Sequence, residues 1–124
     1  MTIREQIALT DATVPNRYSR EVKIAWLNTL DHMVFKEIIE KHEGGDKLLF
    51  NGYNAETNES TELLVPEPYC ELYGYYIEAK IHYLNGETQR YTNAMMMFNT
   101  VYADFGKWYT SCHAPKRRTR FRLF

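Results

Sequence analysis

The sequence predicts an all-α protein, a small bundle of one short helix and three longer ones. Apolar residues recur at steps of three and four along most of the chain, as they do on one face of a helix. Two such patterns within residues 66–113 are rich in aromatic side chains and are separated by Asn85-Gly86, which is typical of a helix stop and turn. Only one segment, at about residues 46–65, carries short strand-like runs instead.

The first helix is predicted over about Thr2–Leu9. Thr2 can cap it, and Glu5 stands three residues later, which is the spacing of a capping box. A linker is expected from Asp11 to Tyr18, because it contains Pro15-Asn16.

The second helix is expected to begin after a cap at Ser19 and to run to about Lys41. Gly44-Gly45 then ends it. Its apolar face is formed by Val22, Trp26, Leu30, Met33, Val34 and Ile38.

The segment at about 46–65 is expected to be a β-hairpin or a long loop. Its two apolar runs, residues 48–50 and 63–65, flank a polar stretch. A small helical domain offers such runs few partners, so the segment is predicted to be an interaction element. Its candidate interface residues are Phe50, Tyr53 and Leu63.

The last two helices are predicted to form a hairpin with one aromatic seam. The earlier helix contributes Tyr69, Leu72, Tyr76, Ala79 and Tyr83, and the later one Tyr91, Met95, Phe98, Tyr102, Phe105, Tyr109 and Cys112. A second stripe on the later helix consists of Ala94, Met97, Val101 and Trp108. We expect Met97 and Val101 to be core, with Trp26 as the partner of this stripe. Trp108 is assigned to an interface with a neighbouring subunit.

The glycines within these two helices, Gly74 and Gly106, are expected to mark the close approach of a neighbouring backbone. Of the Met95-Met96-Met97 run, only Met96 is expected to face outward.

At 124 residues the chain fits one domain, which is predicted to cover 1–114. No run approaches the ~20 apolar residues that span a bilayer, and the polar start is unlike a signal peptide. We therefore expect no membrane association and folding in the cytoplasm. Cys70 and Cys112 lie far apart along an antiparallel hairpin, so both are predicted to be free thiols.

Charge is segregated at the C-terminus. All 16 acidic residues lie within 1–114 against 10 Lys and Arg, a net charge of −6, whereas 115–124 carry five cations and no acid. This basic tail consists of Lys116, Arg117, Arg118, Arg120 and Arg122 with three apolar residues near the end. It can contact DNA phosphates, dock on an acidic protein surface, or remain a solvated tail, and the charge pattern alone leaves these alternatives open.

No catalytic motif, cofactor motif or metal motif is present. Glu78 and His82 share a helix face, and we expect them to form an exposed ion pair rather than a metal site. His32 is expected at the surface, since no nucleophile accompanies it. The sequence therefore predicts no cofactor, no metal and no enzymatic activity.

Several blocks of the sequence together carry a resemblance to a known group of proteins. They are Pro15-Asn16-Arg17-Tyr18-Ser19, Trp26-Leu27, Leu30-Asp31, Phe35-Lys36-Glu37-Ile38-Ile39, Glu62-Leu63-Leu64-Val65-Pro66, Pro68-Tyr69, Leu72-Tyr73, Asn85-Gly86-Glu87, Arg90-Tyr91-Thr92-Asn93, Phe98-Asn99, Tyr102 and Phe105. The chain resembles small proteins encoded in the head-morphogenesis region of tailed phages and prophages. These resemble the head–tail connector (adaptor, head-completion) proteins.

The resemblance implies a virion structural protein that joins portal to tail by self-association into a ring, without catalysis. Its expected partners are the portal and tail-proximal proteins, and its expected locations are the virion and, during assembly, the host cytoplasm. The basic tail departs from the pattern. The alternative function is a nucleic-acid-binding phage accessory or regulatory protein that uses this tail, at the least through non-specific DNA contact.

Overall fold

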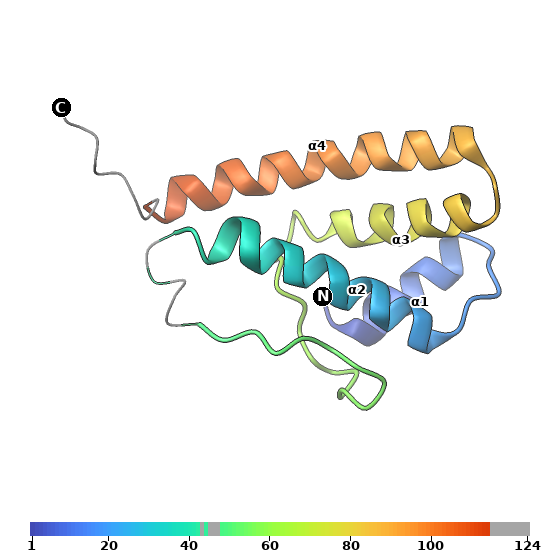
Figure 1. Cartoon of the computed structure of the whole chain (residues 1–124), viewed down its shortest axis with the longest axis horizontal. Helices are drawn as coiled ribbons and strands as arrows, with labels where there is room; N and C mark the ends of the chain where they lie inside the picture. Colours follow the sequence, from blue (N-terminus) through green and yellow to red (C-terminus); the bar gives the residue numbers. More distant parts are fainter. Residues whose placement is uncertain (43, 45–47, 115–124) are drawn as a thin grey trace.

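The computed structural model describes residues 1–42, 44 and 48–114, which contain four α-helices, one π-helical turn and no strand. In chain order these are α1 (Ile3–Thr13), α2 (Arg20–Val34), η1 (Phe35–Ile39), α3 (Glu71–Leu84) and α4 (Thr88–Cys112). The central helix is α3, which packs on α4 along its length and on α1 and α2 with its other faces (Figure 1). The predicted all-α bundle is confirmed.

The N-terminal helix α1 begins as predicted but ends later. Thr2 and Glu5 form the reciprocal capping box, with Glu5 N–H donating to Thr2 Oγ1 at 3.1 Å. The helix continues four residues past Leu9, to Thr13, and its buried face includes the polar residues Gln6 and Thr10. Gln6 donates to Thr10 Oγ1 at 3.1 Å, and both side chains are buried. A pattern of apolar residues does not reveal such a face.

The second helix begins at its predicted cap, where Val22 N–H donates to Ser19 Oγ at 3.3 Å. Its α-helical part ends at Val34, and η1 continues it as a π-helical turn. Ile38 and Ile39 are both buried there. The wider π-helical turn thus places two consecutive side chains in the core. The three- and four-residue spacing of an α-helix does not predict burial of both.

Residues 48–65 form an irregular strap across α1 and α2, so of the two alternatives predicted for this segment the described part is the long loop and not the β-hairpin. The strap joins the N-terminus through a single isolated bridge, Thr2 with Glu62. Ile3 N–H donates to Thr61 O at 3.1 Å, and Leu63 N–H donates to the carbonyl oxygen of Met1 at 3.0 Å. The second apolar run, residues 63–65, therefore packs on the N-terminal segment and the helices rather than on the first run.

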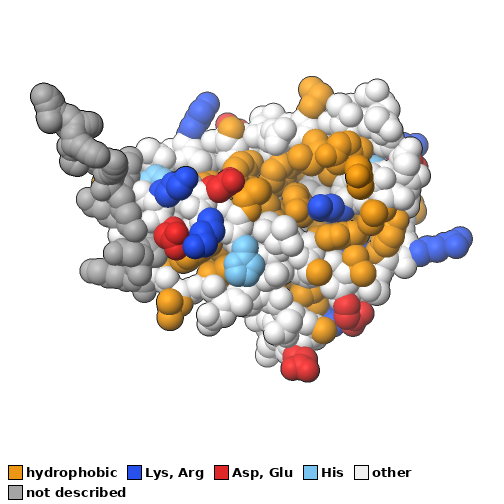
Figure 2. Space-filling model, viewed as in Figure 1, with side chains coloured by type: hydrophobic (Ala, Val, Ile, Leu, Met, Phe, Trp, Pro, Cys, Tyr) orange, Lys and Arg blue, Asp and Glu red, His pale blue; other side chains and the backbone are white. Residues whose placement is uncertain are grey.

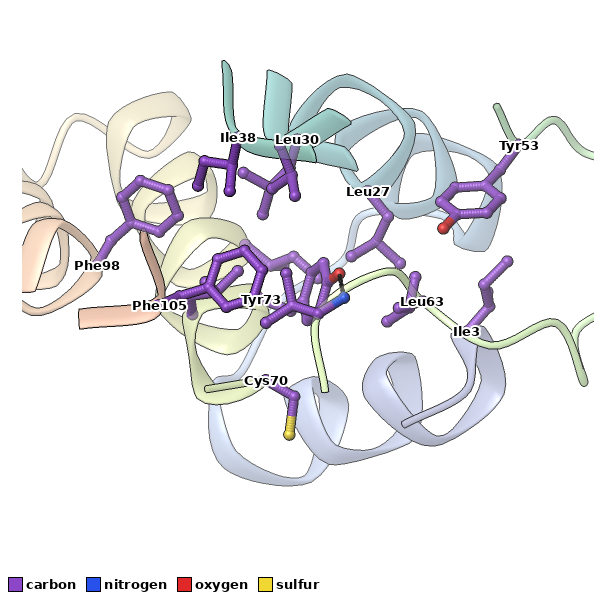
Figure 3. Close-up of a cluster of buried hydrophobic side chains, with 14 of the residues drawn as sticks. Ile3, Leu27, Leu30, Ile38, Tyr53, Leu63, Cys70, Tyr73, Phe98 and Phe105 are labelled. Atoms are coloured by element: carbon purple, nitrogen blue, oxygen red, sulfur yellow. Dashed lines mark hydrogen bonds between the residues drawn. The ribbon is translucent and has the colours of Figure 1, made fainter. Parts of the chain in front are cut away.

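The core lies where α2, α3 and the strap meet (Figure 3). Its largest fully buried side chain is Tyr73, and Phe105 of α4 follows. The seam prediction holds in part, since Leu72, Ala79, Phe98, Phe105 and Tyr109 are buried whereas Cys112 is exposed. It missed the second buried face of α3, formed by Tyr73, Ile77 and Ile81.

Candidate interaction surfaces

The most unusual buried group is the carboxylate of Asp31, on α2. Its Oδ1 accepts a hydrogen bond from Tyr73 Oη at 2.6 Å. Its Oδ2 accepts from Tyr53 Oη at 2.5 Å and from Leu64 N–H at 3.1 Å. Tyr73 Oη in turn accepts from Val65 N–H at 2.8 Å. One carboxylate thus joins α2, α3 and the strap.

Burial of Asp31 raises the pKa of its carboxyl group, and the three donated hydrogen bonds oppose this effect. Burial and the neighbouring carboxylate also raise the pKa of the Tyr53 and Tyr73 hydroxyls. The phenols therefore stay protonated and serve as donors, which holds the strap in place.

Two candidate interface residues are corrected by this arrangement. Tyr53 is 8% exposed and Leu63 is 6% exposed, so both belong to the core of the chain itself. Figure 3 shows Leu63 close to Ile3 of α1 and Leu27 of α2. Helix side chains cover Tyr53 and Leu63, and the spacing of apolar residues within the segment does not reveal such partners.

The remaining interface candidate of the strap, Phe50, is half-buried. Its ring packs 4.8 Å from that of His32, 5.2 Å from that of Tyr53 and 6.1 Å from that of Phe35. The residues before it, Leu48 and Leu49, are 52% and 88% exposed. Leu48, Leu49 and Phe50 are called the strap patch below. Sequence analysis placed these leucines in a strand-like run and did not single them out.

A second apolar surface lies at the turn between α3 and α4. Tyr83 is 66% exposed and Leu84 is 54% exposed, and the ring of Tyr91 lies 5.5 Å from that of Tyr83. Tyr83, Leu84 and Tyr91 are called the tip patch. A groove of about 380 Å³ adjoins it, lined by Tyr76, Ala79, Lys80, Tyr83, Tyr91 and Met95. Apolar side chains gather toward this end of the molecule in Figure 2.

Trp108 is half-buried within the aromatic cluster of its own chain. Its ring lies 5.5 Å from that of Tyr69, which precedes α3, and 6.0 Å from that of Phe105. Trp26, its expected partner, packs instead on Tyr18 at 5.7 Å. Intramolecular packing therefore occupies one side of Trp108, and its assignment as a free interface residue is not supported.

Other expectations for α4 are also corrected. Met97 is 47% exposed and Met96 is 62% exposed, so Met97 does not belong to the core. Gly106 approaches a side chain rather than a backbone, with Ile38 Cδ1 3.9 Å from the position of an added Cβ.

The basic cluster predicted as a DNA or acidic-partner contact, Lys116, Arg117, Arg118, Arg120 and Arg122, lies outside the described residues. The described body that precedes it has an excess of acidic side chains. The two cysteines are free, with Cys70 buried and Cys112 exposed.

His82 is buried rather than exposed. Its Nε2 lies 3.3 Å from Glu78 Oε2 and its Nδ1 lies 2.8 Å from Glu87 Oε1, which makes it a bracket between α3 and the turn. The hydrogen bond from His82 lowers the pKa of Glu87. Within the described part of the chain, no three His, Cys, Asp or Glu side chains are grouped to hold a metal.

None of the described helices is both long and apolar enough to cross a membrane. Comparison of the chain with protein-family models, with curated proteins and with solved structures finds no match.

Proposed function

We propose that the protein is a structural component of a phage virion, a head–tail connector that joins portal to tail by assembling into a ring. This function requires surfaces rather than catalysis. The resemblance over most of the sequence suggests it, and an all-α body with exposed apolar patches is compatible with it.

The observation that carries the proposal is the separation of two different apolar patches. The tip patch lies at the end of the long axis where α3 turns into α4. The strap patch begins toward the opposite end, beyond η1 (Figure 1). A cyclic ring needs such a heterologous contact, in which one surface of a subunit meets a different surface of the next. A single self-complementary patch would instead give a closed dimer.

Each patch has the composition of an interface. Leu49 is 88% exposed and Tyr83 is 66% exposed. Exposure of such large apolar side chains does not stabilise a monomer and is typical of an interaction surface. Tyrosine is enriched at interfaces because it covers apolar surface and keeps a hydroxyl for a polar partner. In this proposal the portal and tail-proximal proteins contact the faces that the ring leaves free.

Light scattering of the purified protein over a range of concentrations tests ring assembly. The expected result is a closed oligomer of defined mass, visible as rings by electron microscopy. Tyr83→Asp should abolish it, whereas the control Val22→Asp should not, since Val22 is also exposed but lies on α2 outside both patches. A monomer at all concentrations, or equal effects of the two variants, would contradict the proposal.

The second candidate, nucleic-acid binding through the basic tail, is favoured by the charge segregation alone. Five cations without an acid in 115–124 can neutralise phosphates and release counterions. Binding to duplex DNA at two salt concentrations measures this. Tight binding that weakens steeply with salt, from a protein that forms no ring, would favour the second candidate over the first.

A further inference from the structure

A groove between α1 and α3 combines an apolar floor with an acidic rim. It encloses about 220 Å³ and is lined by Met1, Gln6, Leu9, Thr10, Thr13, Val14, Cys70, Glu71, Gly74, Tyr75 and Glu78. Among the described residues that line it, the charged groups are these two glutamates and the N-terminal amine, which pairs with Glu62. The lining belongs to neither the strap patch nor the tip patch.

The size of the groove limits what it can hold. A cavity of roughly 150 Å³ accommodates one benzene ring, so this groove has room for one aromatic side chain and little more. Leu9, which is 50% exposed, stands at its edge, and Gly74 leaves space on the α3 side. The suitable occupant is therefore an extended segment with one aromatic anchor, not a helix.

The C-terminal tail has this composition. Arg118, Arg120 and Arg122 alternate with Thr119, Phe121 and Leu123. In an extended chain, successive side chains point to opposite sides, so the arginines share one side and Phe121 lies on the other. Such a segment can place a phenyl ring in the groove while the flanking cations reach its rim.

The tail also starts at the correct end of the groove. The ring of Trp108, in the last part of α4, lies 5.5 Å from that of Tyr69, and the next two residues, Cys70 and Glu71, line the groove. From Ala114 to Phe121 an extended chain spans at most about 25 Å. The antiparallel packing of α3 and α4 thus places the last part of α4, after which the tail begins, at the same end of α3 as Cys70 and Glu71.

We infer that the groove between α1 and α3 is the docking site of this chain's own C-terminal tail. Phe121 fills the apolar floor, and Arg120 and Arg122 pair with Glu71 and Glu78. Docking covers apolar surface and neutralises part of the acidic rim. Docking also engages arginines that the second candidate function, nucleic-acid binding, requires for contact with DNA. The inference is independent of the proposed ring assembly.

A disulfide trap in the full-length protein tests this docking. In a Cys112→Ser background, Phe121→Cys places a thiol in the groove, where native Cys70 lies. Mild oxidation should then remove both free thiols and leave the protein monomeric on a non-reducing gel. The matched control, Arg120→Cys in the same background, points its thiol away from the floor and should cross-link several-fold more slowly.

The rim is tested by Glu71→Gln together with Glu78→Gln, which should slow the cross-link of the Phe121→Cys protein and remove its dependence on salt. Equal rates for the Phe121→Cys and Arg120→Cys proteins would overturn the inference. Attachment of the tail to the end of α4 would then account for both cross-links without docking in the groove. A disulfide-linked dimer would also overturn it, since the groove would then hold the tail of a second copy.

Discussion

At the scale of single residues, Asp31 has the largest structural consequence. It is fully buried, and its three hydrogen-bond donors come from two tyrosines and one backbone N–H of the strap. A buried carboxylate is unfavourable unless it is hydrogen-bonded. The strap is therefore held by a polar node inside an otherwise apolar core.

Asp31→Asn is expected to destabilise the fold by about 2–3 kcal/mol. An amide keeps one acceptor oxygen, but its NH₂ group must face a donor such as Leu64 N–H. Urea denaturation followed by circular dichroism measures this cost. Asp104→Asn, on the exposed side of α4, is the control and should change the free energy of unfolding by less than about 0.5 kcal/mol. Equal stabilities of the two variants would contradict the role of Asp31.

The raised pKa of Asp31 gives a pH dependence of definite sign. Its folded-state pKa lies above the unfolded value of 3.8, so between these two pKa values the folded state binds more protons. The contribution of Asp31 to the free energy of unfolding therefore falls as pH rises through this window. The stability difference between the native protein and Asp31→Asn should be smaller at neutral pH than near pH 4. A difference that grows with pH would show that the pKa is lowered.

At the scale of elements, the glycines of α4 and of the strap have opposite roles. Gly106 is helical, and an added Cβ would meet only Ile38 Cδ1 at 3.9 Å, an ordinary contact. Gly52 has φ of +83°, and an added Cβ would lie 2.4 Å from Asn28 Oδ1. One glycine is replaceable and the other is required by the backbone.

Gly106→Ala should therefore stabilise the protein by about 0.5–1 kcal/mol, because alanine restricts the unfolded chain and favours the helix. Gly52→Ala should destabilise it, since the strap would have to move away from α2. Thermal melts of both variants provide the comparison. A loss of stability in Gly106→Ala would mean that η1 and α4 pack more tightly than the 3.9 Å contact indicates.

Trp108→Ala should cost about 2 kcal/mol, less than the roughly 3–5 kcal/mol of a fully buried aromatic residue. The reason is that its ring packs on Tyr69 and Phe105 but remains half-exposed. Met97→Ala, on the exposed side of α4, is the control and should cost less than about 0.5 kcal/mol. Thermal melts combined with light scattering measure both effects. Lost self-association with unchanged stability would restore Trp108 as an interface residue.

The sequence was sufficient to predict elements with apolar periodicity and capping residues. The capping box at Thr2, the cap at Ser19 and the turn at Asn85-Gly86 are all present. It was insufficient where polar groups are buried. The extended α1 buries the Gln6–Thr10 pair, and the strap depends on Asp31, which resembles an ordinary surface aspartate in the sequence.

The interaction surfaces were predicted less well than the fold. A segment with short apolar runs and no strand partner predicts exposure of Tyr53 and Leu63, yet both are buried. Leu49 and Tyr83 are the most exposed large apolar residues of the described chain, although Leu49 lies in a strand-like run and Tyr83 on a helical stripe, two patterns typical of burial. Exposure of this kind follows from how elements are arranged in space, which local spacing does not record.

At the scale of the whole molecule, the proposed ring depends on two unlike patches toward opposite ends of the long axis. The tip patch belongs to the α3–α4 hairpin, and the strap patch adjoins the end of α2 and the start of η1, where His32 and Phe35 pack on Phe50. In a head-to-tail ring each interface uses one patch of each kind. Loss of either patch therefore blocks closure but leaves the other patch able to bind.

Mixing two complementary variants measures this property most directly. Leu49→Asp lacks a functional strap patch and Tyr83→Asp lacks a functional tip patch, so each alone should be monomeric by light scattering. An equimolar mixture should form a dimer and nothing larger, because only one intact interface can form between the two. A mixture that stays monomeric, or variants that still form the full ring, would contradict head-to-tail assembly through these patches.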